Sequence, residues 1–262
     1  MIYLEKLRKI NMSNPEISKK SEELKMSASV EKIEKPEEEN PEALKAKVRL
    51  LQGQLTEALN VIGYLENEVE NYKEMAVNDK LTGLKNRRAF EEELMRVAKE
   101  IHFGRVYPER RQKFYIKDAA LIFLDIDNFK KVNDTYGHLS GDKVLQEVAA
   151  ILKQHTRDTD FTGRWGGEEM VVMLLGAGEK EGAQKAEELR NALMAKEILV
   201  KDSEILRVTA SFGVAAFGEE ISGDPEMWVE FADRALYEAK RTGKNRVYTF
   251  NQIMEEKLEQ FH

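Results

Sequence analysis

The sequence predicts an α/β (α+β) fold in which a mixed, mainly antiparallel sheet is flanked by helices and preceded by a long coiled-coil helix. Residues 44–76 repeat apolar positions at alternating spacings of four and three, which is typical of a coiled coil. From residue 119 onward, strand-like apolar runs alternate with helical segments. The chain has 262 residues, enough for one domain with its own core and an appendage.

The composition excludes several classes of function. The chain is 42% apolar and 34% charged, and its net charge of −7 argues against generic binding to nucleic acid or an anionic membrane. It has no cysteine, which excludes disulfides, thiolate metal sites and a cysteine nucleophile. No apolar run approaches the ~20 residues of a membrane helix, and no signal-peptide pattern opens the chain. We therefore expect a cytoplasmic protein without a membrane span.

The first 78 residues predict a tail and a dimerisation helix. Residues 1–41 are polar and weakly periodic, so they predict a mostly disordered tail. Residues 42–78 follow a heptad pattern, and β-branched residues at a with leucine at d favour a parallel two-stranded coil. The a positions are Val48, Leu55, Ile62 and Val69, and the d positions include Leu44, Leu51 and Leu65. The alternative is a single amphipathic helix packed on its own domain; the length and strictness of the repeat favour the coil.

The globular domain is expected over 79–250, followed by a C-terminal tail at 251–262. A turn at 78–88 precedes a helix at 88–101 and a polar, basic loop at 103–117. The continuous apolar run at 119–124 predicts a buried central strand. The expected later elements are helices at 128–134 and 141–154, strands at 161–165 and 170–175, a helix at 179–196, a small hairpin at 198–200 and 204–206, a strand at 208–216, a helix at 225–241 and a strand at 246–250.

This order contains the split β-α-β-β-α-β, ferredoxin-like plan. In that plan the first strand pairs antiparallel with the strand that leaves the hairpin, so Asp125 should meet Glu168 and Glu169 at one sheet edge. Gly166 and Gly167 indicate a two-residue hairpin, because primed turns need positive φ at their central positions. Three converging carboxylates are costly unless a cation binds, and oxygen ligands suit Mg²⁺. The hairpin motif alone leaves open a plain turn with solvated acids.

A helix expected to start at Asn128 adds an anion-binding feature beside these acids. Its free N–H groups and positive dipole end favour an anion, and Lys130 and Lys131 lie in its first turn. Acids that hold a metal beside a basic helix start are the arrangement used for phosphoryl or nucleotidyl transfer. Taken alone, the two lysines read as ordinary surface residues.

Six motifs together resemble the GGDEF family of diguanylate cyclases. They are DKLTGLKNR at 79–87, LDIDNFKKVNDTYGH at 124–138, GD at 141–142, GGEEM at 166–170, SFGVA at 211–215, and DRALYEAK at 233–240 with GKN at 243–245. The resemblance spans about residues 79–250 and implies a nucleotidyl-cyclase-type fold. It also implies a homodimeric enzyme that condenses two GTP molecules into cyclic di-GMP and two pyrophosphates.

The resemblance implies roles for individual residues. The metal ligands would be Asp125, the backbone carbonyl of Ile126 and Glu168, while Glu169 would be a second ligand or would help to activate the attacking 3′-hydroxyl. Two Mg²⁺ ions per active site are expected, and Mn²⁺ can substitute. The residues implied for GTP binding are Phe129, Lys130, Asn133, Asp142, Gly166, Gly167, Lys240 and Lys244. Lys244 stands where the family often has arginine.

Within that set, Asn133 and Asp142 would bind the guanine. An acid that faces the guanine N1–H and N2 amine discriminates against adenine, whose edge presents an acceptor and a hydrogen there. Met170 stands where the family has phenylalanine; it should point into the core, and we expect activity to survive.

Arg157 and Asp160 match the family's Arg-x-x-Asp inhibitory site, which binds the product; the alternative is a helix-end arginine beside a turn aspartate. At the level of function, the alternative is a catalytically inactive receptor for cyclic di-GMP or GTP. The intact acids Asp125, Glu168 and Glu169 argue against this receptor.

Overall fold

The computed structural model describes residues 41–110, 116–201, 204–217 and 224–259. The tail predicted at 1–41 lies outside these residues except for Pro41. The chain divides into two compact units, Met1–Tyr64 and Leu65–His262. Among the described helices, none combines the length and the apolar character needed to cross a membrane.

Helix α3, Pro41–Val77, matches the predicted coiled-coil segment in position. Its heptad side chains are exposed by 39% to 62% in the single chain: Leu44, Val48, Leu51, Leu55, Ile62, Leu65, Val69 and Tyr72. Such a continuous apolar stripe on an exposed helix is the pattern of a surface that packs against another molecule. The pairing of two such helices stays a prediction.

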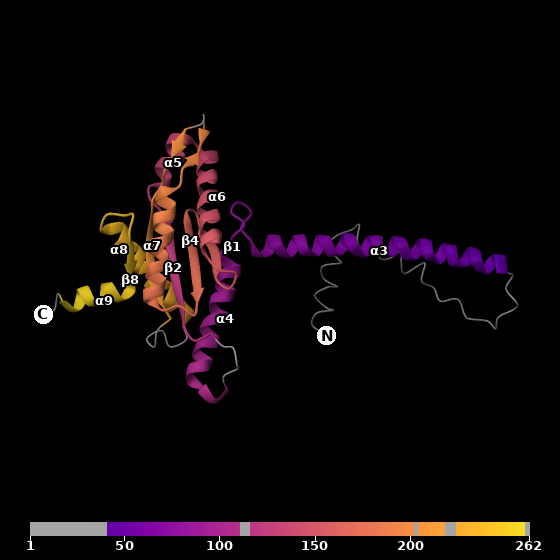
Figure 1. The fold of residues 1–262 in the computed structure, drawn as a ribbon, viewed down its shortest axis with the longest axis horizontal. Coiled ribbons are helices and arrows are strands. Elements are labelled where there is room, and N and C mark those ends of the chain that lie inside the picture. The colour runs from indigo at the N-terminus through magenta and orange to yellow at the C-terminus, as the bar shows by residue number, and fades with distance from the viewer. Residues whose placement is uncertain (1–40, 111–115, 202–203, 218–223, 260–262) are drawn as a thin grey trace. The chain divides into compact units, whose positions relative to one another are not determined.

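A six-stranded sheet forms the centre of the second unit (Figure 1). The strand order is β1-β3-β4-β2-β7-β8, with bounds Lys85–Asn86, Phe161–Gly166, Glu169–Leu175, Ala119–Ile126, Ala210–Ala216 and Val247–Thr249. β2 pairs antiparallel with both β4 and β7, and the two outermost strands pair in parallel with their neighbours. The four inner strands therefore have the predicted ferredoxin-like order. The predicted hairpin of β5, Ile198–Leu199, and β6, Ile205–Leu206, forms a separate small sheet.

Helices cover both faces of this sheet and make two cores. Even-numbered residues of β2, such as Ile122 and Leu124, pack in one core with α5 (Phe129–Tyr136), α6 (His138–His155) and α7 (Glu179–Ala195). The odd-numbered residues Leu121 and Phe123 pack in the other core with α4 (Arg87–Val106), α8 (Pro225–Arg241) and α9 (Phe250–Glu259). Strand side chains alternate between faces, so a strand buried on both sides is apolar throughout. This alternation puts Asp125 on the α8 side.

Several predicted boundaries are wrong at their ends. The loop predicted at 103–117 is helical through Val106 and continues into the 3₁₀ turn η1, Pro108–Arg110; its residues 111–115 lie outside the described part. α6 begins at His138 rather than residue 141, and β7 begins at Ala210 rather than 208. The two-residue strand β1 was not predicted, because so short a segment has no periodicity of its own.

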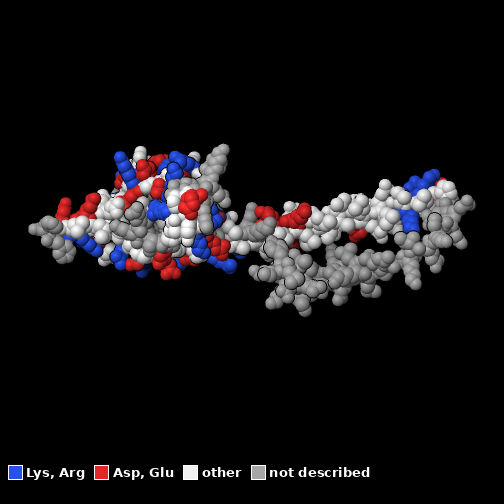
Figure 2. Space-filling view, turned by 90° about the horizontal axis from the view of Figure 1, so that it is seen from below, with Lys and Arg blue, Asp and Glu red and all other residues white. Residues whose placement is uncertain are grey.

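Surface charge on the globular unit is mixed in sign. Figure 2 shows lysine and arginine side chains interspersed with aspartate and glutamate over its visible face. The visible length of α3 is drawn mostly in the colour of uncharged residues, with charges gathered toward its two ends. Interspersed charges favour solubility of a surface rather than electrostatic binding of a polyanion.

Candidate active site

Two of the three acids predicted to converge, Asp125 and Glu169, lie opposite each other where β2 ends and β4 begins. In the antiparallel ladder of β2 and β4, Asp125 lies directly opposite Glu169, at the end of one strand and the start of the other. Directly opposed residues have Cβ atoms about 4.5–5.5 Å apart, so the two carboxyl groups share one environment. Asp125 is buried and Glu169 is half-buried.

This shared environment disfavours negative charge. Burial raises the pKa of Asp125; the contact with Lys240 opposes this rise but does not cancel it, and the charges of Glu168 and Asp127 add to it. Burial also raises the pKa of Glu169, and the Asp125 charge adds to that rise. Carboxylates whose pKa values are raised by burial and by each other are in a place that a bound cation would stabilise.

A lysine ammonium already contacts one acid of this pair. Lys240, in the last turn of α8, lies with its Nζ 2.8 Å from a carboxylate oxygen of Asp125. The alternation of β2 side chains explains this pairing, because Asp125 faces the side of the sheet that α8 covers. Over the described ranges, no three Asp, Glu or His side chains are gathered in a geometry that could hold a metal ion.

The hairpin turn that carries the other acid is displaced by one residue from the prediction. β3 ends at Gly166 and β4 begins at Glu169, so Gly167 and Glu168 are the two turn residues. Gly167 has a φ of 51°, the left-handed value that favours glycine. The expectation of positive φ at both glycines is wrong, because Gly166 still pairs with Glu169. Met170 is fully buried, as predicted.

α5 starts at Phe129, four residues after Asp125 in the chain. Asn128 has a φ of 58° and is the N-cap residue of α5, but its side chain makes no capping hydrogen bond; its side-chain oxygen accepts one from Lys244 Nζ at 2.6 Å instead. Phe129 is buried at the first position of the helix, while Lys130 is exposed at the second. Lys244 and Lys240 thus bring two ammonium groups to the end of β2 and the start of α5.

The buried carboxylate of Asp127, to which no sequence pattern assigned a role, links the segments that surround the end of β2. Asp127 accepts hydrogen bonds from the hydroxyls of Thr209 and Ser211, both at 2.7 Å, and from the backbone N–H of Asn245 at 3.0 Å. Hydrogen bonds to a charged carboxylate are among the stronger ones in proteins. The Asn245 contact fixes the loop that carries Lys244. The Asp125-x-Asp127 spacing was the available signal, but its partners lie more than 80 residues away in the chain.

The two residues implied for guanine binding come from neighbouring helices. A Cβ added at Gly141 would lie 1.9 Å from the side-chain oxygen of Asn133, so the Asn133 amide rests against the backbone of α6. Asp142 follows Gly141 on the same helix. The glycine therefore allows a close approach that brings Asn133 beside the turn of helix that carries Asp142.

Arg157 and Asp160 form a local turn between α6 and β3. The Asp160 carboxylate accepts hydrogen bonds from the backbone N–H of Arg157 at 3.1 Å and of Leu175 at 3.2 Å. Arg157 is exposed. Asp160 therefore has a structural role at the end of β4.

A model of the family described as "Diguanylate cyclase, GGDEF domain" matches residues 76–246. The curated relatives include Diguanylate cyclase DgcP of Pseudomonas aeruginosa, 35% identical over 221 residues, which are 84% of this chain and 31% of that protein. Diguanylate cyclase A of Treponema denticola is 38% identical over 174 residues, 66% of this chain and 44% of that protein. The chain thus spans less than half the length of these curated relatives.

Solved structures give the same result. The coiled coil and GGDEF domain of DgcB from Caulobacter crescentus, in complex with c-di-GMP, has a TM-score of 0.66 at 31% identity and covers 76% of this chain and 98% of that one. Diguanylate cyclase SiaD from Pseudomonas aeruginosa, in complex with its activator SiaC, has a TM-score of 0.57 at 29% identity, covering 94% of this chain and 85% of that one. Because the family model spans most of the chain and these relatives agree with it, this chain belongs to the GGDEF diguanylate cyclase family.

Proposed function

We propose that this chain is a diguanylate cyclase that condenses two GTP molecules into cyclic di-GMP and two pyrophosphates. It acts as a homodimer held by residues 42–78, with residues 79–250 as the catalytic domain. The single observation that carries the proposal is the pairing of Asp125 with Glu169 across β2 and β4, at an edge where Lys240 and Lys244 supply positive charge. Family membership supports the same reaction.

Different residues of the chain bind the guanine, bind the phosphates and accept the proton. Asn133 and Asp142 hold the guanine, and Lys240, Lys244 and the start of α5 hold the phosphates. In the dimer, the 3′-oxygen of one GTP forms a bond to the α-phosphorus of the other while the bond to pyrophosphate breaks. The 3′-hydroxyl proton leaves toward the Asp125–Glu169 edge, where burial raises the pKa of both carboxyl groups and makes them better proton acceptors than exposed carboxylates.

The oxygen atoms at this edge suit Mg²⁺, with Mn²⁺ as a substitute. The residues that would hold two ions are Asp125, the carbonyl of Ile126, Glu168 and Glu169. The fit rests on the donor chemistry, which is entirely oxygen, and on Lys240 Nζ, whose contact with Asp125 marks this place as one that accepts a cation. Bound metal supplies neutralisation of the phosphate charge.

We also propose that the product inhibits the enzyme at Arg157 and Asp160. The exposed position of Arg157 beside a turn fixed by Asp160 supports this role. An arginine can stack on a guanine and donate to it. Because the coupling between two sites is reciprocal, GTP analogues at the active site should in turn change the affinity for product.

Turnover of GTP by the full chain with Mg²⁺ tests the proposal, with the nucleotide products separated by chromatography. Glu169→Gln should lower the rate at least about 100-fold, as expected when a group that stabilises the transition state is removed. Glu92→Gln, on the exposed face of α4, is the matched control and should keep the wild-type rate. Tight cyclic di-GMP binding by a wild-type protein that makes no product would support the receptor instead.

A further inference from the structure

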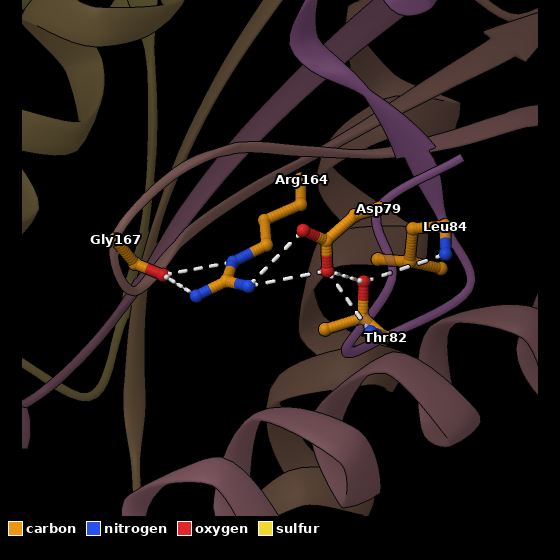
Figure 3. A network of polar contacts seen from close by, with 5 residues as sticks. All are labelled: Asp79, Thr82, Leu84, Arg164 and Gly167. Carbon is orange, nitrogen blue, oxygen red and sulfur yellow. Dashed lines mark hydrogen bonds and ion pairs between the residues drawn. The ribbon is translucent and has the colours of Figure 1, made fainter. Parts of the chain in front are cut away.

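We propose that Arg164 is a positioning residue that ties the turn at the end of α3 to the hairpin carrying Glu168 and Glu169. This inference rests on the proposed cyclase function. It assigns to Arg164 and Asp79 a role in setting the geometry of the acids, although neither residue belongs to the acidic edge itself. The contacts on the two sides of the Arg164 guanidinium carry the argument (Figure 3).

On the hairpin side, the guanidinium holds a single backbone carbonyl with two donors. Arg164 Nε donates to the Gly167 oxygen at 3.0 Å, and Nη2 donates to the same atom at 2.9 Å. The Gly167 carbonyl belongs to the peptide plane that continues into Glu168. Fixing this oxygen therefore fixes the orientation of the peptide from which the Glu168 side chain departs.

On the other side, the same guanidinium contacts a carboxylate far away in the sequence. Arg164 Nη1 lies 3.1 Å and 3.2 Å from the two oxygens of Asp79, which is 85 residues earlier. The side chains are 18% and 23% exposed, so this ion pair is partly shielded from solvent. A partly buried, multiply bonded arginine pair is worth more than an exposed one.

Asp79 is itself held rigidly by its own turn. Its side chain accepts hydrogen bonds from the backbone N–H of Thr82 at 2.9 Å and from the Thr82 hydroxyl at 2.7 Å. Its backbone N–H donates to the Leu84 carbonyl at 2.7 Å, and its carbonyl accepts from Gly83 at 2.8 Å. Leu84 is buried in the core that lies under α6. Asp79 is therefore a fixed anchor rather than a mobile surface acid.

This anchored turn is also bonded to the last residues of α3 and to β3. Asn86 Nδ2 donates to the Ala76 carbonyl at 2.8 Å, and Asn78 forms a bridge with Lys85. Asn86 itself pairs with Arg164 in the parallel ladder of β1 and β3. The end of α3, the turn and the hairpin are therefore joined through contiguous backbone and side-chain contacts within one unit. A change in the last turn of α3 reaches the Gly167 carbonyl through only two side chains.

Only arginine can make this arrangement, because it needs one planar group with donors on two sides. A lysine ammonium is a point charge that could satisfy the Asp79 carboxylate or the Gly167 carbonyl, but not both in this geometry. We expect Arg164→Met to lower kcat by roughly 10- to 100-fold, the scale of loss that follows a misplacement of about 1 Å. KM for GTP should change less than kcat does, because Asn133 and Asp142, the residues assigned to guanine, are untouched.

The decisive set of variants uses the full chain. Arg164→Lys should lie between wild type and Arg164→Met in kcat, and Asp79→Asn should lower kcat in the same direction. The double variant should be about as slow as Arg164→Met alone, because the two residues act as one unit. Arg88→Met removes an exposed, ion-paired arginine from α4 and is the matched control, with no change expected. A folded Arg164→Met with kcat within about twofold of wild type would overturn the proposal, as would additive losses.

Hydrogen exchange of the hairpin amides tests the same inference without turnover. Arg164→Met should exchange at least about tenfold faster across Gly166–Met170, with unchanged exchange across α7. Arg164→Lys serves if the methionine variant does not fold, and its faster hairpin exchange supports the proposal. Unchanged hairpin exchange in a folded Arg164 variant would contradict it. If the wild-type chain made no cyclic di-GMP but Arg164→Met still exchanged faster at the hairpin, the proposed reaction would be wrong and the structural role of Arg164 would stand. The failure of one proposal can therefore be told from the failure of the other.

Discussion

Helix α3 and strand β2 are both rich in apolar residues, but the chain uses them in opposite ways. The apolar side chains of β2 are at most 2% exposed, because helices cover both faces of the sheet. The heptad side chains of α3 are all at least 39% exposed. The globular unit therefore buries its own apolar surface. The apolar stripe of α3, in contrast, stays exposed to solvent among the described residues.

The difference indicates that β2 stabilises the fold of the globular unit, and it supports the proposal that α3 serves self-association. Substitutions in the buried segment should change the free energy of unfolding of the domain. Matched substitutions in α3 should leave that quantity alone and change self-association. The predictions below test this division, beginning with the largest expected effect.

Gly213→Ala should be the most damaging change in the core. A Cβ at Gly213 would lie 2.1 Å from the backbone nitrogen of Leu236 and 2.2 Å from the carbonyl oxygen of Ala232, so α8 would have to move off β7. We expect a loss of more than about 4 kcal/mol in unfolding free energy, which is the upper range for overpacking. Urea denaturation followed by circular dichroism measures it. A loss below about 1 kcal/mol would contradict the close packing of α8.

A matched pair of leucine truncations compares the two regions directly. Leu124→Ala in β2 should cost about 2–5 kcal/mol, because it opens a cavity in a packed core. Leu55→Ala in α3 removes the same atoms from an exposed position and should leave the unfolding of the globular unit unchanged. Thermal unfolding at low protein concentration, where self-association contributes least, reports both. Equal losses of unfolding free energy in the two variants would contradict the proposed difference between β2 and α3.

Ile62→Glu should weaken self-association of the chain. The charge falls at an a position of the heptad, where the proposed partner helix would bury it, and we expect the dimer dissociation constant to rise roughly 100-fold. Sedimentation velocity over a range of concentrations measures this constant. Leu50→Glu, also exposed on α3 but outside the a and d positions, is the control and should leave association intact. Equal effects of the two variants would argue against the heptad seam.

Lowering the pH should remove a smaller contribution to the free energy of unfolding, one made by the turn at Asp79 that follows α3. Burial opposes ionisation of Asp79, but hydrogen bonds from Thr82 and the Arg164 guanidinium outweigh it and lower the pKa of that carboxyl. A lowered folded-state pKa gives stability that is complete above the unfolded-state pKa and is lost as pH falls through the folded value. We expect wild type to exceed Asp79→Asn by about 1 kcal/mol at pH 7 and to lose this advantage in acid. Urea titrations of both proteins in parallel, from pH 7 down through the folded-state pKa of Asp79, test it.

Gly53→Ala should have the smallest effect and the opposite sign. A Cβ at Gly53 would meet no described atom within 4 Å, and alanine favours the helix over glycine by up to about 1 kcal/mol. The helical signal of the full chain should rise or stay unchanged, as circular dichroism would show. The contrast with Gly213→Ala is direct, because the same methyl group is added in both. A destabilised Gly53→Ala would reveal a close neighbour on α3.

Sequence patterns alone determined the local structure. The heptads predicted α3, the unbroken apolar run predicted β2, and the glycine pair predicted a hairpin near Glu168. The order of elements also predicted that Asp125 meets Glu169, because a ferredoxin-like plan fixes which strands pair. These features depend on the periodicity of neighbouring residues and on a small set of allowed connections.

Only the tertiary structure determined which distant side chains support the acids. Asp127 meets Thr209, Ser211 and Asn245, and Arg164 meets Asp79, through contacts that no local pattern encodes. The turn shifted by one residue for the same reason, since the ladder register rather than the glycine pair sets where β3 ends. Register and helix placement depend on how whole elements pack, so the sequence predicted the acids and the fold supplied their partners.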